Sequence, residues 1–141
     1  MAKFGMSMCV LGMAGEFREH GIGVNALWPR TGIWTAAMKM LGGGHDDAAK
    51  GCRWPEIMSD AAYEQLISDP KKYSGNFEID ESFLRTRGYT DFEKYDCVKG
   101  ADLFPDFFTA EAAKIYENNA AADSNTGTLK SERKYSYNFF G

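Results

Sequence analysis

The stretch Ile22-Gly23-Val24-Asn25-Ala26-Leu27-Trp28 decides the fold, and Pro29 closes it. Its residues are almost continuously apolar, which is typical of a parallel β-strand that is covered on both faces. Proline cannot donate to a strand ladder, so Pro29 marks the point where the strand ends. We therefore predict a buried parallel strand over residues 22–28, with other elements covering it.

The residues before this strand predict a helix over 3–20. Apolar side chains recur at helical spacing at Phe4, Met8, Leu11 and Ala14. Other apolar residues fill the remaining sides, and a helix that is apolar nearly all round is expected to be buried on several sides. Gly21 suits the position after the helix end, where the left-handed conformation is common.

After the strand, residues 30–35 are predicted to form a loop and residues 36–41 a short helix with Thr35 as its N-cap. Gly42-Gly43-Gly44 stops that helix, and the segment to Gly51 is expected to be a mobile loop. His45, Asp46, Asp47 and Cys52 lie near one another in sequence, but their spacing matches no metal-ligand pattern. We therefore expect a solvated loop and no metal site.

Residues 55–68 predict a second helix, and residues 75–80 alternate like a strand. The expected inner face of the helix consists of Ile57, Met58, Ala61, Ala62, Leu66 and Ile67. Strand alternation would place Glu78 and Asp80 together on a solvent face. Strand, helix and strand in this order predict a βαβ unit with parallel strands and a right-handed crossover.

Two strands are too few for an independent sheet, so we expect this α/β fold to be incomplete. Leaving the strand uncovered would expose several large apolar side chains, each worth about 1.5–3 kcal/mol when buried. Residues 82–108 are aromatic and interrupted by glycine, and they predict an irregular extension in which residues 104–108 pack on the surface. A further helix is expected to begin near Thr109 and to fade by Asn118, and residues 120–141 are predicted to be a disordered tail.

Composition excludes several classes of protein. The chain has 141 residues and a net charge of -4, which gives no support for nucleic-acid binding. It contains no run of about 18 apolar residues, so we expect no membrane span. The three cysteines Cys9, Cys52 and Cys97 are widely spaced and odd in number, which argues against a disulfide framework and favours a reducing compartment.

The motifs resemble one enzyme family. Lys3-Phe4-Gly5-Met6-Ser7 is followed by Val24-Asn25-Ala26-Leu27-Trp28-Pro29, then by residues 53–63 and by Ser74–Glu81. This order is similar to the second half of the short-chain dehydrogenases/reductases. The resemblance covers residues 1–110. It implies the C-terminal portion of a doubly wound, Rossmann-type parallel sheet over residues 1–81, followed by a family-specific extension over 82–119.

The resemblance also implies site residues. Lys3 corresponds to the catalytic lysine, which lowers the pKa of a tyrosine and hydrogen-bonds the nicotinamide ribose of NADP or NAD. Pro29, Ile33 and Thr35 match the cofactor-binding loop, and Thr31 competes with Thr35 because this loop is one residue longer than usual. An exposed lysine and a simple helix N-cap remain the alternatives for Lys3 and Thr35.

The substrate and the partners are likewise implied. Met38, Met40 and Leu41 stand where the family places its substrate lid, and flexible methionine suits a lipid-like alcohol or ketone. A helix face that packs on the core is the alternative for these residues. Helix 3–20 corresponds to an element that packs between subunits, which implies a homo-oligomer for the intact enzyme. The resemblance places that enzyme in the peroxisome or the mitochondrion, although no targeting signal is visible.

The chain also departs from the family pattern at several positions that the catalytic reaction needs. The tyrosine of the Tyr-x-x-x-Lys motif would lie before Met1, and the glycine-rich phosphate turn and the catalytic serine are not found. Arg30 stands where the family commonly has glycine. We therefore expect a fragment or a shortened isoform that is inactive alone. The alternatives are a noncatalytic isoform that binds full-length subunits through helix 3–20, and an unrelated small binding domain.

Overall fold

A computed structural model describes residues 2–106 of the chain. The chain divides into two compact units. Unit 1 consists of Met1–Pro29 and Trp54–Tyr95, and unit 2 consists of Arg30–Arg53 and Asp96–Gly141. The predicted helix near Thr109 and the predicted tail over 120–141 lie outside the described residues.

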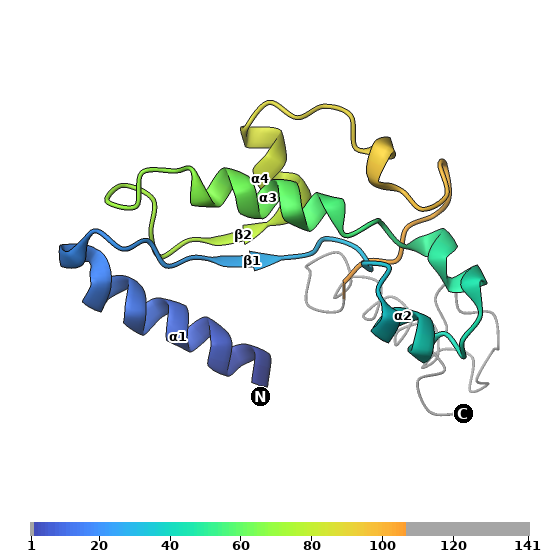
Figure 1. Ribbon diagram of the computed structural model, residues 1–141, viewed down its shortest axis with the longest axis horizontal. Helices are drawn as coiled ribbons and strands as arrows, with labels where there is room; N and C mark the ends of the chain where they lie inside the picture. The colour runs from blue at the N-terminus through green and yellow to red at the C-terminus, as the bar shows by residue number, and fades with distance from the viewer. Residues whose placement is uncertain (1, 107–141) are drawn as a thin grey trace, which may run out of the picture. The chain divides into compact units, whose positions relative to one another are not determined.

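Unit 1 is built on a small parallel sheet (Figure 1). Strand β1 covers Ala26–Trp28 and pairs in parallel with β2, which covers Phe77–Ile79. Ala26 lies opposite Phe77, and Trp28 lies opposite Ile79. The prediction of two parallel strands is confirmed, and the α/β class with it. Residues 26–28 are half-buried within the described chain, rather than fully covered.

Both strands are shorter than predicted because the residues that lead into them bond to side chains. Asn25 Oδ1 accepts hydrogen bonds from the backbone and side-chain nitrogens of Asn76, at 3.0 and 2.9 Å. The Val24 amide donates to Ser74 Oγ at 3.1 Å. These side-chain bonds join the two segments ahead of the strands, beside the backbone bond from the Gly75 amide to Val24 O at 2.7 Å. The ladder therefore begins only at Ala26.

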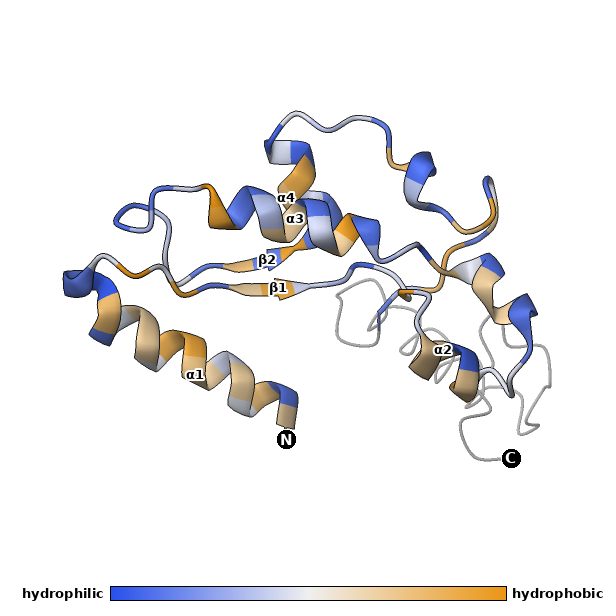
Figure 2. Ribbon diagram, in the orientation of Figure 1, coloured by the Kyte–Doolittle hydropathy of each residue, from blue (hydrophilic) through white to orange (hydrophobic). Residues whose placement is uncertain are grey.

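Helix α1 covers Ala2–Phe17 and continues into a 3-10 turn, η1, over Arg18–His20. Gly21 follows with φ of 68°, as the predicted left-handed cap requires. Figure 2 shows α1 as apolar along most of its length. Ala14 is nevertheless its one buried residue, so the expected burial on several sides is absent from the described chain. No helix within residues 2–106 has the length and apolar content needed to cross a membrane.

The core of unit 1 lies between two helices. Helix α3 covers Glu56–Leu66 and packs on both β1 and α4, which covers Asp80–Thr86. The core side chains on these helices are Ile57, Ala61, Phe83 and Leu84. Leu66 is 84% exposed and Ile67 is 58% exposed, so the predicted inner face of the helix is wrong at its C-terminal end.

Helix α4 was not predicted, and it corrects two expectations. Asp80 is fully buried and begins this helix, so it does not share a solvent face with Glu78. Glu81 is also buried, and its Oε1 forms an ion pair at 2.7 Å with Nη2 of Arg85, one helical turn later. Glu78 instead accepts a hydrogen bond from the Tyr73 hydroxyl at 2.7 Å. The strand alternation was therefore extended one residue too far.

Unit 2 contains helix α2 over Ala36–Leu41 and a 3-10 helix, η2, over Asp46–Gly51. The short helix at 36–41 is confirmed. The mobile loop predicted over 42–51 is wrong for η2, because Gly51 is buried there and is followed by the fully buried Cys52. A further 3-10 turn, η3, covers Glu93–Tyr95 in unit 1.

Candidate functional site

The segment from Thr31 to Thr35 follows β1 in the chain and is held in an extended form within unit 2. The Arg53 amide donates to Gly32 O at 2.9 Å, and the Trp34 amide donates to Arg53 O at 2.8 Å. These two bonds form a parallel bridge between Ile33 and Arg53. The flanking residues supply the bonding groups, so the peptide N–H and C=O of Ile33 take no part in that bridge.

The extension after η3 holds the same segment through a second bridge. The Gly32 amide donates to Phe104 O at 2.8 Å, and the Asp106 amide donates to Arg30 O at 2.9 Å. Thr31 consequently forms an antiparallel bridge with Pro105. Residues 104–106 therefore pack on this segment, and residues 107 and 108 lie outside the described part.

A buried ion pair fixes Arg53, the residue that carries the first bridge. Its Nε lies 3.0 Å from Asp96 Oδ1, and both side chains are less than one-tenth exposed. A buried pair of this kind costs several kcal/mol to break, because the remaining charge loses its partner. The ion pair with Asp96 thus holds Arg53 in place, and with it the bridge to Ile33. Sequence reasoning missed this pair, because 43 residues separate its members.

Thr31 carries a hydroxyl that suits a ligand. Its side chain is buried, and Oγ1 has no hydrogen-bond partner among the described residues. Buried polar atoms are normally satisfied, so an orphaned hydroxyl calls for an explanation. A ligand group that accepts or donates one hydrogen bond would satisfy it. This observation fits the predicted cofactor role of the segment.

Thr35 is the N-cap of α2, as predicted. Its Oγ1 accepts a hydrogen bond from the Met38 amide at 3.3 Å. A threonine hydroxyl that accepts in this way still has its own O–H to donate. Thr35 is exposed, so that O–H is open to a phosphate or another acceptor. The capping role and the binding role are compatible.

The structure brings together three of the five predicted site residues. Thr31, Ile33 and Thr35 lie on one extended segment of unit 2, whereas Lys3 and Pro29 belong to unit 1. Lys3 is exposed in the first turn of α1, and its carbonyl accepts a hydrogen bond from Ser7 Oγ at 3.3 Å. Pro29 directly follows β1.

The acidic loop residues near His45 pair with lysines. Asp46 lies 2.8 Å from Lys39 Nζ, and Asp47 lies 3.0 Å from Lys50 Nζ. The exposed fractions of these four side chains range from 48% to 85%. Within residues 2–106, no group of three potential ligands is placed to hold a metal ion.

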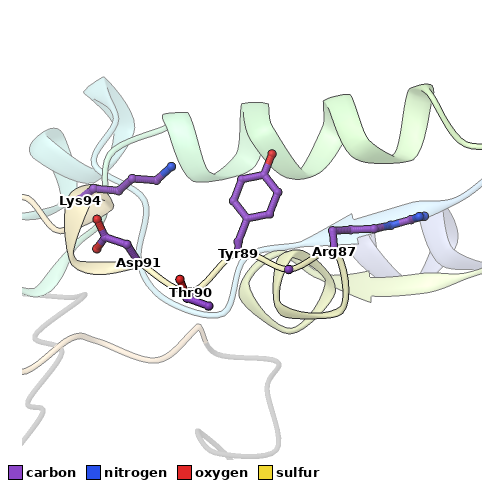
Figure 3. A pocket seen from close by; sticks show the side chains of 6 residues that line it. Arg87, Tyr89, Thr90, Asp91 and Lys94 are labelled. Atoms are coloured by element: carbon purple, nitrogen blue, oxygen red, sulfur yellow. The ribbon is translucent and has the colours of Figure 1, made fainter.

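A hollow lies in unit 1, between α4 and η3, and has a volume of about 400 Å³ (Figure 3). Its lining residues are Arg87, Gly88, Tyr89, Thr90, Asp91 and Lys94. Both of its cations already have interactions. Arg87 donates to Ser68 Oγ at 2.8 Å, and Lys94 lies 3.8 Å from Asp60. Sequence reasoning gave no signal for this hollow, and its contacts indicate no particular chemistry.

The chain contains a Tyr-x-x-x-Lys pattern at Tyr95 and Lys99, but its environment does not suit catalysis. Tyr95 is buried at the end of η3, and its hydroxyl donates to Asp60. Burial, together with the Asp60 carboxylate, raises the pKa of Tyr95 well above the ordinary value. A catalytic tyrosine requires the opposite shift, because its phenolate must form near neutral pH.

Comparisons with known proteins agree with the fold. No family profile matches the chain. It is 47% identical over 137 residues to hydroxysteroid dehydrogenase-like protein 2 of Xenopus tropicalis, a match that covers 94% of this chain and 32% of the relative. The protein of the same name from Danio rerio is 55% identical over 108 residues, which cover 77% of this chain and 25% of the relative.

The solved structures give the same result. A short-chain dehydrogenase from Mycobacterium thermoresistibile superposes with a TM-score of 0.70 and 44% sequence identity. The match covers 79% of this chain and 39% of that protein. The chain thus spans between a quarter and two-fifths of the length of these relatives. These similarities exclude the second alternative, an unrelated small binding domain.

Proposed function

Because this chain has the sequence similarity and a partial fold of the short-chain dehydrogenases/reductases, we propose that it supplies the carboxyl-terminal part of an NAD(P)-dependent oxidoreductase. The observation that carries the proposal is the segment after β1. It holds the buried, unsatisfied Thr31 hydroxyl at a place where open α/β sheets bind ligands, beyond the carboxyl end of a parallel strand.

The residues of this segment have distinct roles in the proposal. The peptide groups of Ile33 bind the nicotinamide carboxamide, because they take no part in the bridge to Arg53. The hydroxyl of Thr35, or that of Thr31 in the alternative register of the loop, donates to the neighbouring phosphate. Lys3 hydrogen-bonds the ribose, and its positive charge stabilises the phenolate of the catalytic tyrosine. The nicotinamide supplies hydride transfer when it is bound.

The substrate in this proposal is a lipid-like alcohol or ketone, with NADP as the preferred cofactor. Met40 is 73% exposed and Leu41 is 54% exposed at the end of α2, next to the glycine-rich turn. Flexible apolar side chains near a cofactor segment suit a substrate with few polar groups. The proposed compartment of the intact enzyme is the peroxisome or the mitochondrion, and its proposed state is a homo-oligomer.

We further propose that the 141-residue chain is inactive by itself. The proton donor cannot be Tyr95, whose hydroxyl is buried against Asp60. Catalysis then requires a tyrosine and a phosphate-binding turn supplied by another part of the enzyme. The purified chain should therefore show no turnover of carbonyl substrates with NADPH or NADH.

A chimera tests the cofactor role directly. The matched 108 residues of the Danio rerio relative would be replaced by the corresponding residues of this chain. The chimera should bind NADPH, as followed by the fluorescence of the reduced cofactor. Of Thr31→Val and Thr35→Val, the variant at the threonine that contacts the cofactor should weaken binding about tenfold, the equivalent of one hydrogen bond of roughly 1.4 kcal/mol.

Thr90→Val is the matched control, because Thr90 is exposed in unit 1 and should leave cofactor binding unchanged. The two test variants also separate the two possible registers of the loop, since the threonine that contacts the cofactor will show the larger effect. Unchanged binding in both test variants would contradict the proposed cofactor segment.

The second candidate function is a noncatalytic subunit that binds full-length subunits through α1. The exposed apolar surface of α1 favours it: Phe4 is 72%, Met8 is 63% and Leu11 is 56% exposed. Co-purification of tagged chain with a full-length relative, lost in a Met8→Glu/Leu11→Glu variant, would support this function. Retention of binding in that variant would exclude α1 as the contact.

A further inference from the structure

Cys52 and Cys97 are cross-strand neighbours within unit 2. The Cys97 amide donates to Cys52 O at 3.0 Å, and the adjacent residues Arg53 and Asp96 form an antiparallel bridge. The pairing places residue 52 directly opposite residue 97. Side chains directly opposite each other in an antiparallel pair lie on the same face. The two sulfurs therefore occupy the same side of this short ladder.

This arrangement lies within reach of a disulfide. The two residues share one of the two hydrogen bonds of a hydrogen-bonded antiparallel pair, since the Cys52 amide donates to Ala49 O instead. Residues in such a pair have Cα atoms about 5.5 Å apart, and disulfides join Cα atoms about 4.4–6.8 Å apart. Their Cβ atoms start about 5 Å apart and must approach to about 4 Å, so closure needs a small local movement. None of the three cysteines, all of which lie in the described part, forms a disulfide in this structure.

We propose that Cys52 and Cys97 are a redox pair that closes to a reversible intramolecular disulfide when the chain meets a hydroperoxide. The inference does not depend on the proposed oxidoreductase function. It predicts a modification site at the point where the segments before α3 and after η3 meet within unit 2.

The two cysteines differ in a way that sets the order of the reaction. Cys52 is fully buried and donates to Ala48 O at 3.3 Å, whereas Cys97 is half-buried. Burial and, to a smaller extent, the neighbouring Cys97 raise the pKa of the Cys52 thiol to about 11. Cys97 therefore reacts first with an oxidant from solution, and Cys52 acts as the resolving thiol.

The chemistry balances with one molecule of hydrogen peroxide. The Cys97 sulfur attacks the peroxide oxygen, the O–O bond breaks, and a sulfenic acid and one molecule of water form. The Cys52 sulfur then attacks the Cys97 sulfur, which forms the S–S bond and expels hydroxide. The proton from the Cys52 thiol converts this hydroxide to a second water. The two thiols lose two electrons, and the peroxide gains them.

Peptide mapping of the full chain tests the pair. A Cys9→Ser variant removes the exposed third cysteine, hydrogen peroxide is the oxidant, and N-ethylmaleimide blocks the remaining thiols. Trypsin without reductant should release residues 51–53 joined to residues 95–99. Dithiothreitol should abolish this cross-linked species, and its yield should not change when the protein is diluted before oxidation.

Cys97→Ser provides the second arm, because that side chain is only half-buried and tolerates a polar replacement. In this variant the cross-link should be absent, and Cys52 should be recovered as the unoxidised thiol because it is buried. Recovery of Cys97 as sulfinic or sulfonic acid, with Cys52 alkylated after denaturation and no joined peptide, would overturn the proposal. A cross-link whose yield falls on dilution would overturn it as well.

Discussion

Gly51 provides the sharpest test of how the extension is held. A Cβ at this position would lie 2.3 Å from Cδ2 and Cε2 of Phe104 and 2.6 Å from its Cγ. Carbon atoms in contact prefer about 3.5–4.0 Å, so the ring would have to retreat by roughly 1 Å or more. Its backbone cannot follow freely, because the Phe104 amide donates to Gly51 O at 2.8 Å.

Gly51→Ala should therefore destabilise this contact by about 2 kcal/mol, within the usual range of about 1–3 kcal/mol for overpacking. Hydrogen exchange at the amides of Phe104 and Gly32 measures it locally, because both amides bond across this contact. A loss of about 2 kcal/mol corresponds to exchange roughly 30-fold faster. Gly12→Ala is the control. Its Cβ would meet nothing within 4 Å, so exchange at these two amides should not change.

A double-mutant cycle separates the clash from a general effect of the substitution. Phe104→Ala removes the ring, so in that background Gly51→Ala should cost less than about 0.5 kcal/mol, and the coupling should exceed about 1 kcal/mol. An equal cost of Gly51→Ala in both backgrounds would refute the reasoning, because the ring would then not be the obstacle.

Three further expectations follow from the described contacts. Asp96→Asn removes the carboxylate that pairs with the buried Arg53 guanidinium and should lower stability by about 3 kcal/mol in urea denaturation; a loss under about 1 kcal/mol would contradict the buried pair. Burial raises the pKa of Tyr95, so the folded protein favours the neutral hydroxyl. The contribution of Tyr95 to the free energy of unfolding is therefore complete below about pH 10, the pKa in the unfolded chain, and is lost as the pH rises above that value. Tyr95→Phe should accordingly flatten the fall in stability with pH by up to about 1.4 kcal/mol per pH unit, and an unchanged slope would exclude Tyr95 as the source. Thr35→Ala should lose about 1 kcal/mol of capping and speed hydrogen exchange at Met38, whereas Thr35→Ser should retain the protection.

Sequence patterns predicted the parts of the fold that depend on local signals. Continuous apolar residues before Pro29 identified β1, and the N-cap signal of Thr35 identified α2. Helix α4, seven residues long, escaped detection because no side chain caps its start, unlike that of the six-residue α2, and because its first residue completes an apparent strand alternation at Asp80. Periodicity cannot resolve so short a helix.

In the candidate site, too, only the features that have a local sequence signal could be predicted. The family motif located Thr31, Ile33 and Thr35, which the structure places on one segment. The groups that hold this segment, Arg53 and Phe104, come from distant parts of the chain, and nothing in their local sequence announces the pairing. The exposed Leu66 was also unpredictable, because helical periodicity does not reveal which apolar residues lie on the covered side.

The apolar surface of α1 has a consequence for how long the chain survives in a cell. Three glycines interrupt this helix, and each lowers its helical stability by about 1 kcal/mol relative to alanine. An uncovered helix of this kind opens readily, and proteases cleave opened segments in proportion to how often they open. Turnover of the chain should thus begin at its amino-terminal helix, and any molecule that covers α1 would set the abundance of the protein.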